Sequence, residues 1–164
     1  MCSSDLHLVR NGLRTFTSLN VRVAESLDVH YVAVLIGAGA TTVNAYLAQE
    51  SIADRHRRGL FGAMSLREAV GRYKKAVDKG LLKIMSKMGI GVLSSYRGGM
   101  NFEAIGLSRA LVAEFFPGTP SRISGIGLSG IARRVLALHR KAWAEGAITL
   151  PIGGLYKQIG RAHV

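Results

Sequence analysis

The chain has 164 residues, of which 48% are hydrophobic and 20% are charged, and its formal net charge is +12. This composition is typical of one globular domain or part of one, and it excludes a disordered tail. No apolar run approaches the roughly 18 to 20 residues that a membrane-spanning helix needs. We therefore predict a soluble chain with no membrane partner.

The two ends of the chain mirror each other at the level of codons. Residues 1–5 (MCSSD) and 159–163 (IGRAH) can be encoded by reverse-complementary codons, and the shared string resembles a common sequencing adapter. We therefore expect residues 1–6 and 159–164 to be foreign and residues 7–158 to be native. The single cysteine, Cys2, then lies outside the native part, which leaves no thiol for a disulfide, a metal cluster or a nucleophile.

The first predicted elements are a strand and a helix. Residues 17–23 alternate between polar and apolar side chains, as in a half-buried strand. Ser26 and Asp28 then offer N-cap side chains to a helix whose apolar residues recur at steps of three and four. This helix is predicted to end at Gly37 or Gly39.

A second helix is predicted over residues 42–52, and the basic stretch 54–62 that follows is predicted to be a loop. Ser65 and Glu68 have the spacing of a capping box, in which each side chain satisfies a free backbone donor at a helix start. The helix that they open is predicted to end at Gly80.

Shorter elements are predicted in the second half. Residues 81–88 indicate a short helix and residues 90–94 a buried strand. Further helices are predicted over residues 101–105, 108–115 and 129–143. Short strands that alternate with helices favour an α/β fold with parallel pairing. We predict a partial parallel sheet flanked by helices, as in an incomplete β/α-barrel, which sequence outside this chain completes.

The excess of basic residues is divided among clusters at 55–58, 74–79 and 133–141. Such an excess can indicate nucleic-acid binding. No nucleic-acid-binding motif accompanies the clusters, however, and aromatic residues make up only 7% of the chain, too few for a base-stacking platform. A solvated or interdomain surface is favoured, and we expect no nucleic-acid partner.

The glycines at positions 125, 127 and 130 form a G-x-G-x-x-G pattern ahead of a predicted helix, where backbone donors could hold a phosphate. A dinucleotide site would also need an acidic residue about twenty positions later, at the end of a second strand. Glu145 comes too early. Tight helix packing and turn geometry are therefore favoured over phosphate binding.

A second candidate region surrounds the predicted strand 90–94, because open α/β sheets bind ligands at the carboxyl ends of their strands. Lys83, Lys87 and Arg97 bracket this strand, and two glycines follow it. The alternative is that these cations contact an adjacent domain while the glycines allow a tight turn. No pair of histidines has the spacing of a metal site, and we identify neither metal ligands nor catalytic residues.

Several stretches resemble the large subunit of glutamate synthase in their sequence and in their order. They are HLVRNGLRTFTSLNVRV, DVHYVAVLIGAGATTVNAYLA, YKKAVDKGLLKIMSKMGI, SYRGGMNFEAIGLS and SRISGIGLSGI. The resemblance covers nearly all of residues 7–158. With LPIGGLYK it is greatest to the bacterial NADPH-dependent type.

The resemblance implies a cytoplasmic enzyme of ammonia assimilation that converts glutamine, 2-oxoglutarate and a reductant into two glutamates. It also implies FMN and an iron-sulfur cluster in the parent protein, with NADPH and FAD acting through a small subunit, or ferredoxin in the plant type. The glutaminase cysteine and the flavin barrel of the family lie outside this chain.

The resemblance places this chain in the latter part of the central domain, as an inactive structural connector between the glutaminase and FMN domains. The candidates for interdomain or tunnel roles are Lys83, Lys87, Ser94, Tyr96, Arg97, Gly98 and Gly99. The alternatives are a self-contained phosphate- or flavin-binding α/β domain and a basic nucleic-acid-binding module.

Overall fold

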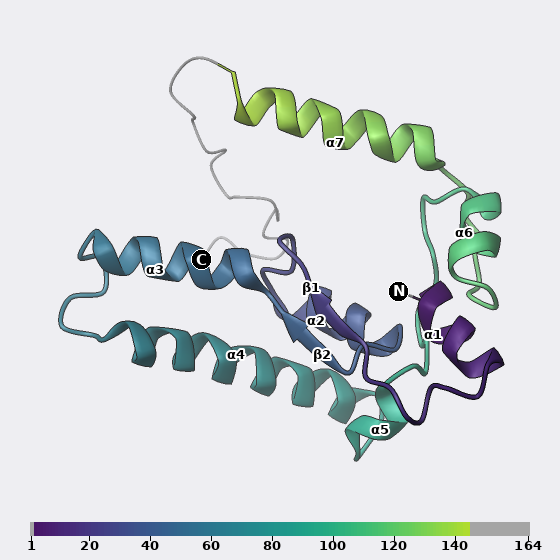
Figure 1. Ribbon diagram of the computed structural model, residues 1–164, viewed down its shortest axis with the longest axis horizontal. Coiled ribbons are helices and arrows are strands. Elements are labelled where there is room, and N and C mark those ends of the chain that lie inside the picture. Colours follow the sequence, from purple (N-terminus) through teal and green to yellow (C-terminus); the bar gives the residue numbers. More distant parts are fainter. Residues whose placement is uncertain (1, 145–164) are drawn as a thin grey trace, which may run out of the picture. The chain divides into compact units, whose positions relative to one another are not determined.

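The computed structural model describes residues 2–144, which form α-helices and two short strands (Figure 1). In chain order they are α1 (Cys2–Arg10), β1 (Asn20–Arg22), α2 (Val29–Gly37), β2 (Thr42–Asn44), α3 (Tyr46–Arg57), α4 (Leu66–Lys87), α5 (Leu93–Tyr96), α6 (Arg109–Phe115) and α7 (Leu128–Ala142). Contacts divide the chain into residues 1–125 and residues 126–164. None of the helices in the described part is long and apolar enough to cross a membrane.

The sheet consists of β1 and β2, which pair in parallel with Val21 opposite Val43. Helix α2 connects the two strands, so residues 20–44 form the β-α-β unit that parallel pairing requires. Across the pair, Thr42 Oγ1 donates a hydrogen bond of 2.8 Å to Asn20 Oδ1. The predicted partial parallel sheet with flanking helices is confirmed, and its completion into a barrel-like domain stays a prediction.

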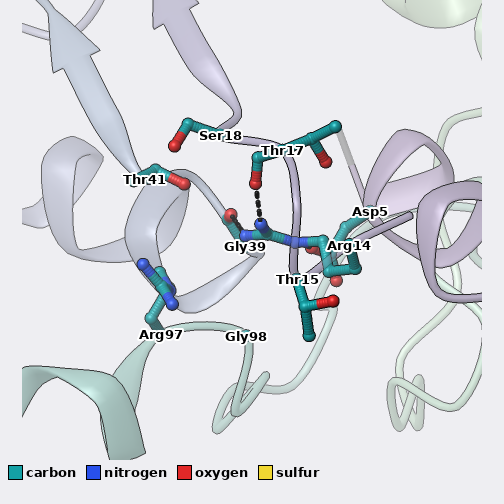
Figure 2. A pocket seen from close by; sticks show the side chains of 9 residues that line it. All are labelled: Asp5, Arg14, Thr15, Thr17, Ser18, Gly39, Thr41, Arg97 and Gly98. Carbon is teal, nitrogen blue, oxygen red and sulfur yellow. Dashed lines mark hydrogen bonds and ion pairs between the residues drawn. The ribbon is translucent and has the colours of Figure 1, made fainter. Parts of the chain in front are cut away.

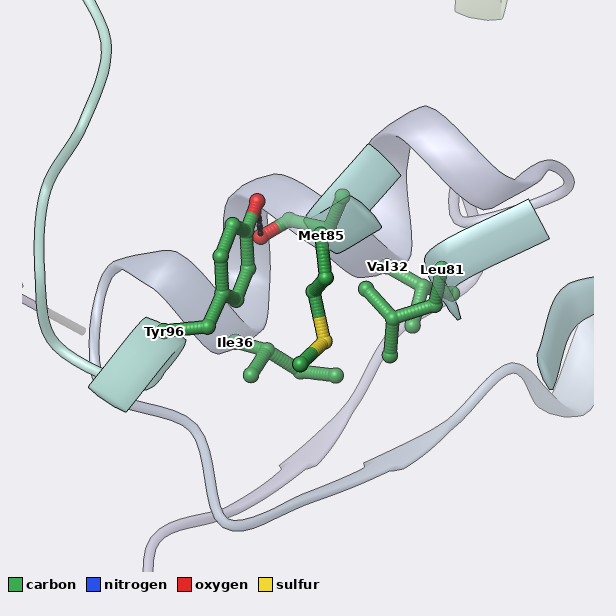
Figure 3. Packing of buried hydrophobic residues seen from close by; sticks show 6 residues of the cluster. Val32, Ile36, Leu81, Met85 and Tyr96 are labelled. Atoms are coloured by element: carbon green, nitrogen blue, oxygen red, sulfur yellow. Dashed lines mark hydrogen bonds between the residues drawn. The ribbon is translucent and has the colours of Figure 1, made fainter. Parts of the chain in front are cut away.

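The core of the first unit lies where α2, α4 and α5 meet (Figure 3). Val32 and Ile36 of α2 pack against Leu81 and Met85 of α4, and Tyr96 of α5 closes the cluster. All five side chains are at most 9% exposed. Burying side chains of this size stabilises a fold by about 1.5–3 kcal/mol each, so this cluster determines how the three helices are arranged.

Three helices begin at side-chain N-caps, of which Asp28 and Ser65 were predicted. The Asp28 carboxylate accepts hydrogen bonds from the first turn of α2, Ser65 Oγ accepts from the Glu68 backbone N–H at 3.2 Å, and Ser108 Oγ caps α6. Ser26, the other predicted cap of α2, is instead fully buried, and its hydroxyl has no hydrogen-bond partner among residues 2–144. The end of α2 at Gly37 is also confirmed.

The predicted helix 42–52 is wrong at its start, because residues 42–44 form β2 and α3 begins only at Tyr46. β-Branched Thr42 and Val43 favour extended backbone, and their pairing with β1 outweighs the helical spacing of the apolar residues. Helix α3 then continues to Arg57, so the first residues of the predicted basic loop are helical.

Gly80 does not end a helix, because α4 runs through it without interruption from Leu66 to Lys87. The glycine is required by packing: a Cβ atom at position 80 would lie 2.7 Å from Val29 Cγ2. The two helices predicted at 65–79 and 81–88 are therefore one helix, and its close approach to α2 takes place at Gly80.

The actual end of α4 explains why the predicted strand 90–94 does not form. Gly89 has a positive φ of 71°, and the Ile90 backbone N–H donates to Met85 O at 3.0 Å, as in a Schellman cap. The cap turns the chain, and α5 begins at Leu93. The apolar run 90–94 thus belongs to a helix cap and a short helix.

The predicted helix 101–105 is also wrong, since these residues are not helical. The Ala104 N–H donates to Pro120 O at 2.8 Å, and the Gly106 N–H donates to Ile123 O at 3.0 Å. Backbone donors that an adjacent segment satisfies are not available for i to i−4 bonds. This long-range pairing has no signal in the local sequence.

The described part of the second unit consists mainly of α7, which confirms the predicted helix 129–143 to within one residue at each end. Apolar residues at steps of three and four occupy one face, and basic residues occupy the opposite face. The apolar face includes Leu128, Val135 and Leu138, which are 59%, 54% and 66% exposed. The basic face carries Arg133, Arg134, Arg140 and Lys141.

Substitutions at the two glycines within α4 test the close approach. Gly71→Ala adds a methyl group with no atom within 4 Å and is expected to stabilise the chain by about 0.5–1 kcal/mol through helix propensity. Gly80→Ala gains the same propensity but meets stiff, β-branched Val29, and overpacking costs about 1–3 kcal/mol. Urea unfolding of both variants measures the free energy of unfolding of each. A Gly80→Ala chain as stable as Gly71→Ala would contradict the packing.

Candidate functional site

A polar pocket lies in the first unit at the amino-terminal edge of the sheet (Figure 2). Its volume is about 560 Å³. The segments that lead into β1 and β2 form two walls, and the turn after α5 forms a third. The lining residues are Asp5, Arg14, Thr15, Thr17, Ser18, Gly39, Thr41, Arg97 and Gly98. We call this site the Arg97 pocket.

Arg14 holds the walls of the Arg97 pocket together. Its Nε forms an ion pair with Asp5 of α1, its Nη2 donates to Gly39 O at 2.8 Å, and its Nη1 donates to Thr17 O at 2.9 Å. Figure 2 shows the guanidinium between these partners. Because Arg14 and Asp5 are mostly buried and neutralise each other, Arg14 acts as a structural cross-link with few donors left for a ligand.

Tyr96, one of the predicted interdomain or tunnel residues, belongs to the core. Its ring is 3% exposed, and its hydroxyl donates a hydrogen bond of 3.1 Å to Ala33 O of α2. Burial raises the pKa of this hydroxyl above its usual value, since the anionic form would lose hydration. In the described part of the chain, Tyr96 is therefore positioned to join α5 to α2.

The other predicted residues lie on the surface, in two groups. Lys83 and Lys87 are exposed on α4, and neither lines the Arg97 pocket. Ser94, Arg97 and both glycines are exposed on α5 and the turn after it, but only Arg97 and Gly98 reach the pocket. The turn is fixed to α2, because the Gly98 N–H donates to Ile36 O at 3.1 Å.

The sequence places Arg97 at the wrong edge of the sheet. Its predicted position was the carboxyl end of a strand 90–94, but no strand forms there, and the turn instead contacts the segments before β1 and β2. The pocket hydroxyls of Thr15, Thr17, Ser18 and Thr41 were not predicted as site residues. The only signal for them is that hydroxyl side chains precede both strands.

Two glycines of the G-x-G-x-x-G pattern are explained by packing. A Cβ atom at position 125 would overlap the Gly106 carbonyl, and one at position 130 would lie 2.8 Å from Ile126 Cβ. Gly127 is the N-cap residue of α7. Backbone packed this closely supports the interpretation as turn and helix packing. Within residues 2–144, no three histidine, cysteine or acidic side chains lie close enough together to hold a metal ion.

An apolar cleft of about 370 Å³ lies among α2, β2, α3 and α4. Its walls include Val43, Tyr73, Val77 and Leu81. Burial, together with the negative charge of Asp28, raises the pKa of Tyr73. Apolar walls of this kind suit the packing of an apolar segment. The lining also includes Lys74 and Asp78, which are exposed.

Comparisons with known proteins agree on one family. Residues 2–108 match the family model described as the glutamate synthase central domain. The glutamate synthase [NADPH] large chain of Azospirillum brasilense is 71% identical over 151 residues, which is 92% of this chain and 10% of that protein. The corresponding large chain of Bacillus subtilis is 42% identical over 139 residues, 85% of this chain and 9% of that protein.

The ferredoxin-dependent glutamate synthase of Spinacia oleracea is 39% identical over 148 residues, 85% of this chain and 9% of that protein. The chain thus spans about a tenth of the length of the curated relatives that it matches.

The Tyr96 hydroxyl gives a prediction about the pH dependence of stability. Unfolded tyrosine titrates near pH ~10, and the folded chain holds this proton more tightly. The stabilisation is therefore complete below pH ~10 and is lost as the pH rises through the folded pKa.

Tyr96→Phe should cost about 0.5–1.5 kcal/mol at pH 7 through the lost hydrogen bond to Ala33. The difference from the unmodified chain should shrink above pH ~10, where the unmodified chain starts to lose this stabilisation. Urea unfolding at pH 7, 9 and 10.5 measures it. A difference that grows with pH would contradict a raised tyrosine pKa.

Proposed function

The chain belongs to the glutamate synthase central-domain family, and from this premise we propose that it is the latter part of that domain in a bacterial NADPH-dependent large chain. The observation that carries the proposal is the 71% identity to the NADPH large chain of Azospirillum brasilense over 92% of this chain. Identity to the ferredoxin-dependent protein of Spinacia oleracea is 39%, which favours NADPH as the reductant of the parent. Residues 7–158 are the proposed native part.

The proposed reaction of the parent converts glutamine, 2-oxoglutarate and NADPH into two glutamates. The residues described here do not fit the redox groups of such an enzyme. Iron-sulfur clusters are bound by several cysteine thiolates, and this chain has a single cysteine. Close packing at Gly125 and Gly130 argues against a phosphate-binding loop for FMN. The proposed FMN and cluster sites therefore lie elsewhere in the large chain, and FAD lies in a partner small subunit.

A role as structural connector between the glutaminase and FMN domains accounts for what the described residues do offer. They bring together a polar pocket and an apolar cleft but no catalytic constellation. Lys83, Lys87, Ser94, Arg97 and Gly99 are exposed and free to contact a neighbouring domain. Contact with solvent alone would explain why the charged residues are exposed. It does not explain why the leucines and valines of α7 are exposed.

Activity assays test the assignment to this enzyme. The full large chain that contains this segment, purified with its small subunit, should form glutamate from glutamine, 2-oxoglutarate and NADPH. The 164-residue chain alone should form none, because its proposed native part, residues 7–158, has no cysteine to act as the glutaminase nucleophile or to bind an iron-sulfur cluster. Glutamate formation by the short chain, or no glutamate formation by the complete enzyme with all three substrates present, would contradict the proposal. Reactions with each substrate withheld in turn are the controls.

The connector role predicts that the rest of the large chain covers the apolar face of α7. Leu138→Ser should then lower the unfolding temperature of the domain that contains α7, measured within the large chain, by about 4 °C or more, since burying a leucine contributes about 1.5–3 kcal/mol. Ala137→Ser on the opposite face is the matched control and should change it by less than about 1 °C. Equal melting temperatures for the two variants would show that this face is not covered.

A further inference from the structure

We propose that the Arg97 pocket is a binding site for a carboxylate group, with the Arg97 guanidinium as its charged donor. The site deepens the connector role and therefore rests on the proposed function for its place in the large chain. Its chemistry follows from the donors and acceptors that line the pocket.

Arg97 is the uncommitted cation of the pocket. The guanidinium of Arg14 already interacts with Asp5, Thr17 and Gly39. Within the described residues, the Arg97 side chain forms no ion pair or hydrogen bond, and it is exposed. Figure 2 shows its guanidinium directed from the turn after α5 toward Thr41.

The surroundings of Arg97 supply hydroxyl donors and lack a free anion. Thr41 Oγ1 accepts a bond of 3.1 Å from the Leu19 N–H, which leaves its own hydrogen available. Thr15 and Ser18 line the same pocket, and among the described residues their hydroxyls are not committed. The single carboxylate of the lining, Asp5, is paired with Arg14. A pocket with spare donors and one net positive charge favours an anionic ligand.

A carboxylate fits this set better than a phosphate. The planar guanidinium presents two parallel N–H donors that can pair with two oxygens of either group, so charge decides between them. One uncommitted guanidinium balances one negative charge, whereas a phosphate carries more charge than the pocket neutralises. The hydroxyls would bind the remaining lone pairs.

The residues that form the site lie within the proposed native part. Arg97 and the three hydroxyl residues fall between positions 15 and 97, far from both ends of the chain. Asp5 lies in the segment 1–6 that is expected to be foreign. A neutral residue in its place would free the Arg14 Nε and make the pocket more positive, so the binding of an anion through Arg97 does not depend on Asp5, whereas the preference for a single negative charge does.

The carboxylate can come from a small free acid or from an aspartate or glutamate elsewhere in the large chain. Thermal unfolding of the large chain distinguishes these sources. Sodium acetate is titrated against sodium chloride at equal ionic strength, for the unmodified chain and for Arg97→Gln and Arg97→Glu. The controls are Arg133→Gln and Arg133→Glu, because Arg133 is exposed in the middle of α7 and lines no described pocket.

A free acid predicts that acetate raises the melting temperature by at least about 1 °C in the unmodified chain and both controls, but in neither Arg97 variant. A carboxylate of the chain predicts no acetate effect and a larger loss for Arg97→Glu than for Arg97→Gln, with no such difference at Arg133. If the Arg97 variants match the Arg133 variants in both measurements, the proposal is overturned. Glutamate formation by the unmodified enzyme tests the proposed function separately.

Discussion

The contact between α2 and α4 is the constraint on which the rest of the first unit depends. Gly80 allows the two helices to approach closely at Val29. The adjacent Leu81 and, about one turn further on, Met85 pack against Val32 and Ile36. The same packing positions α5 through the hydrogen bond from Tyr96 to α2. Because α5 ends at the turn that carries Arg97, the geometry of the pocket follows from the packing of the core.

Features that depend on local chemistry were predictable from the sequence. The caps at Asp28, Ser65 and Ser108, helix α7 and the α/β class all follow from side chains within a few residues of one another. The family also follows from the sequence, because the quoted stretches lie largely within the matched residues 2–108. The roles proposed for individual surface residues remain predictions.

Features that depend on distant partners were not predictable. A glycine within a helical pattern predicts the end of the helix, unless it is known which residue packs against that glycine. At Gly80 the packed residue is Val29, which is far away in the sequence. The segment 101–105 loses its predicted helix to hydrogen bonds with residues 120–123. The pocket was missed for the same reason: its hydroxyls and Arg97 are more than fifty residues apart and meet only after α4 has packed.

The length of α2 and its place between the strands have a consequence for folding during synthesis. The contact between Asn20 and Thr42 spans 22 residues, whereas the one between Tyr96 and Ala33 spans 63. Loop closure costs more entropy as the loop lengthens, and the shorter unit also leaves the ribosome first. The β1–α2–β2 unit therefore exposes its apolar helix face until α4 is translated, which makes this interval the one in which the nascent chain depends most on protection from aggregation.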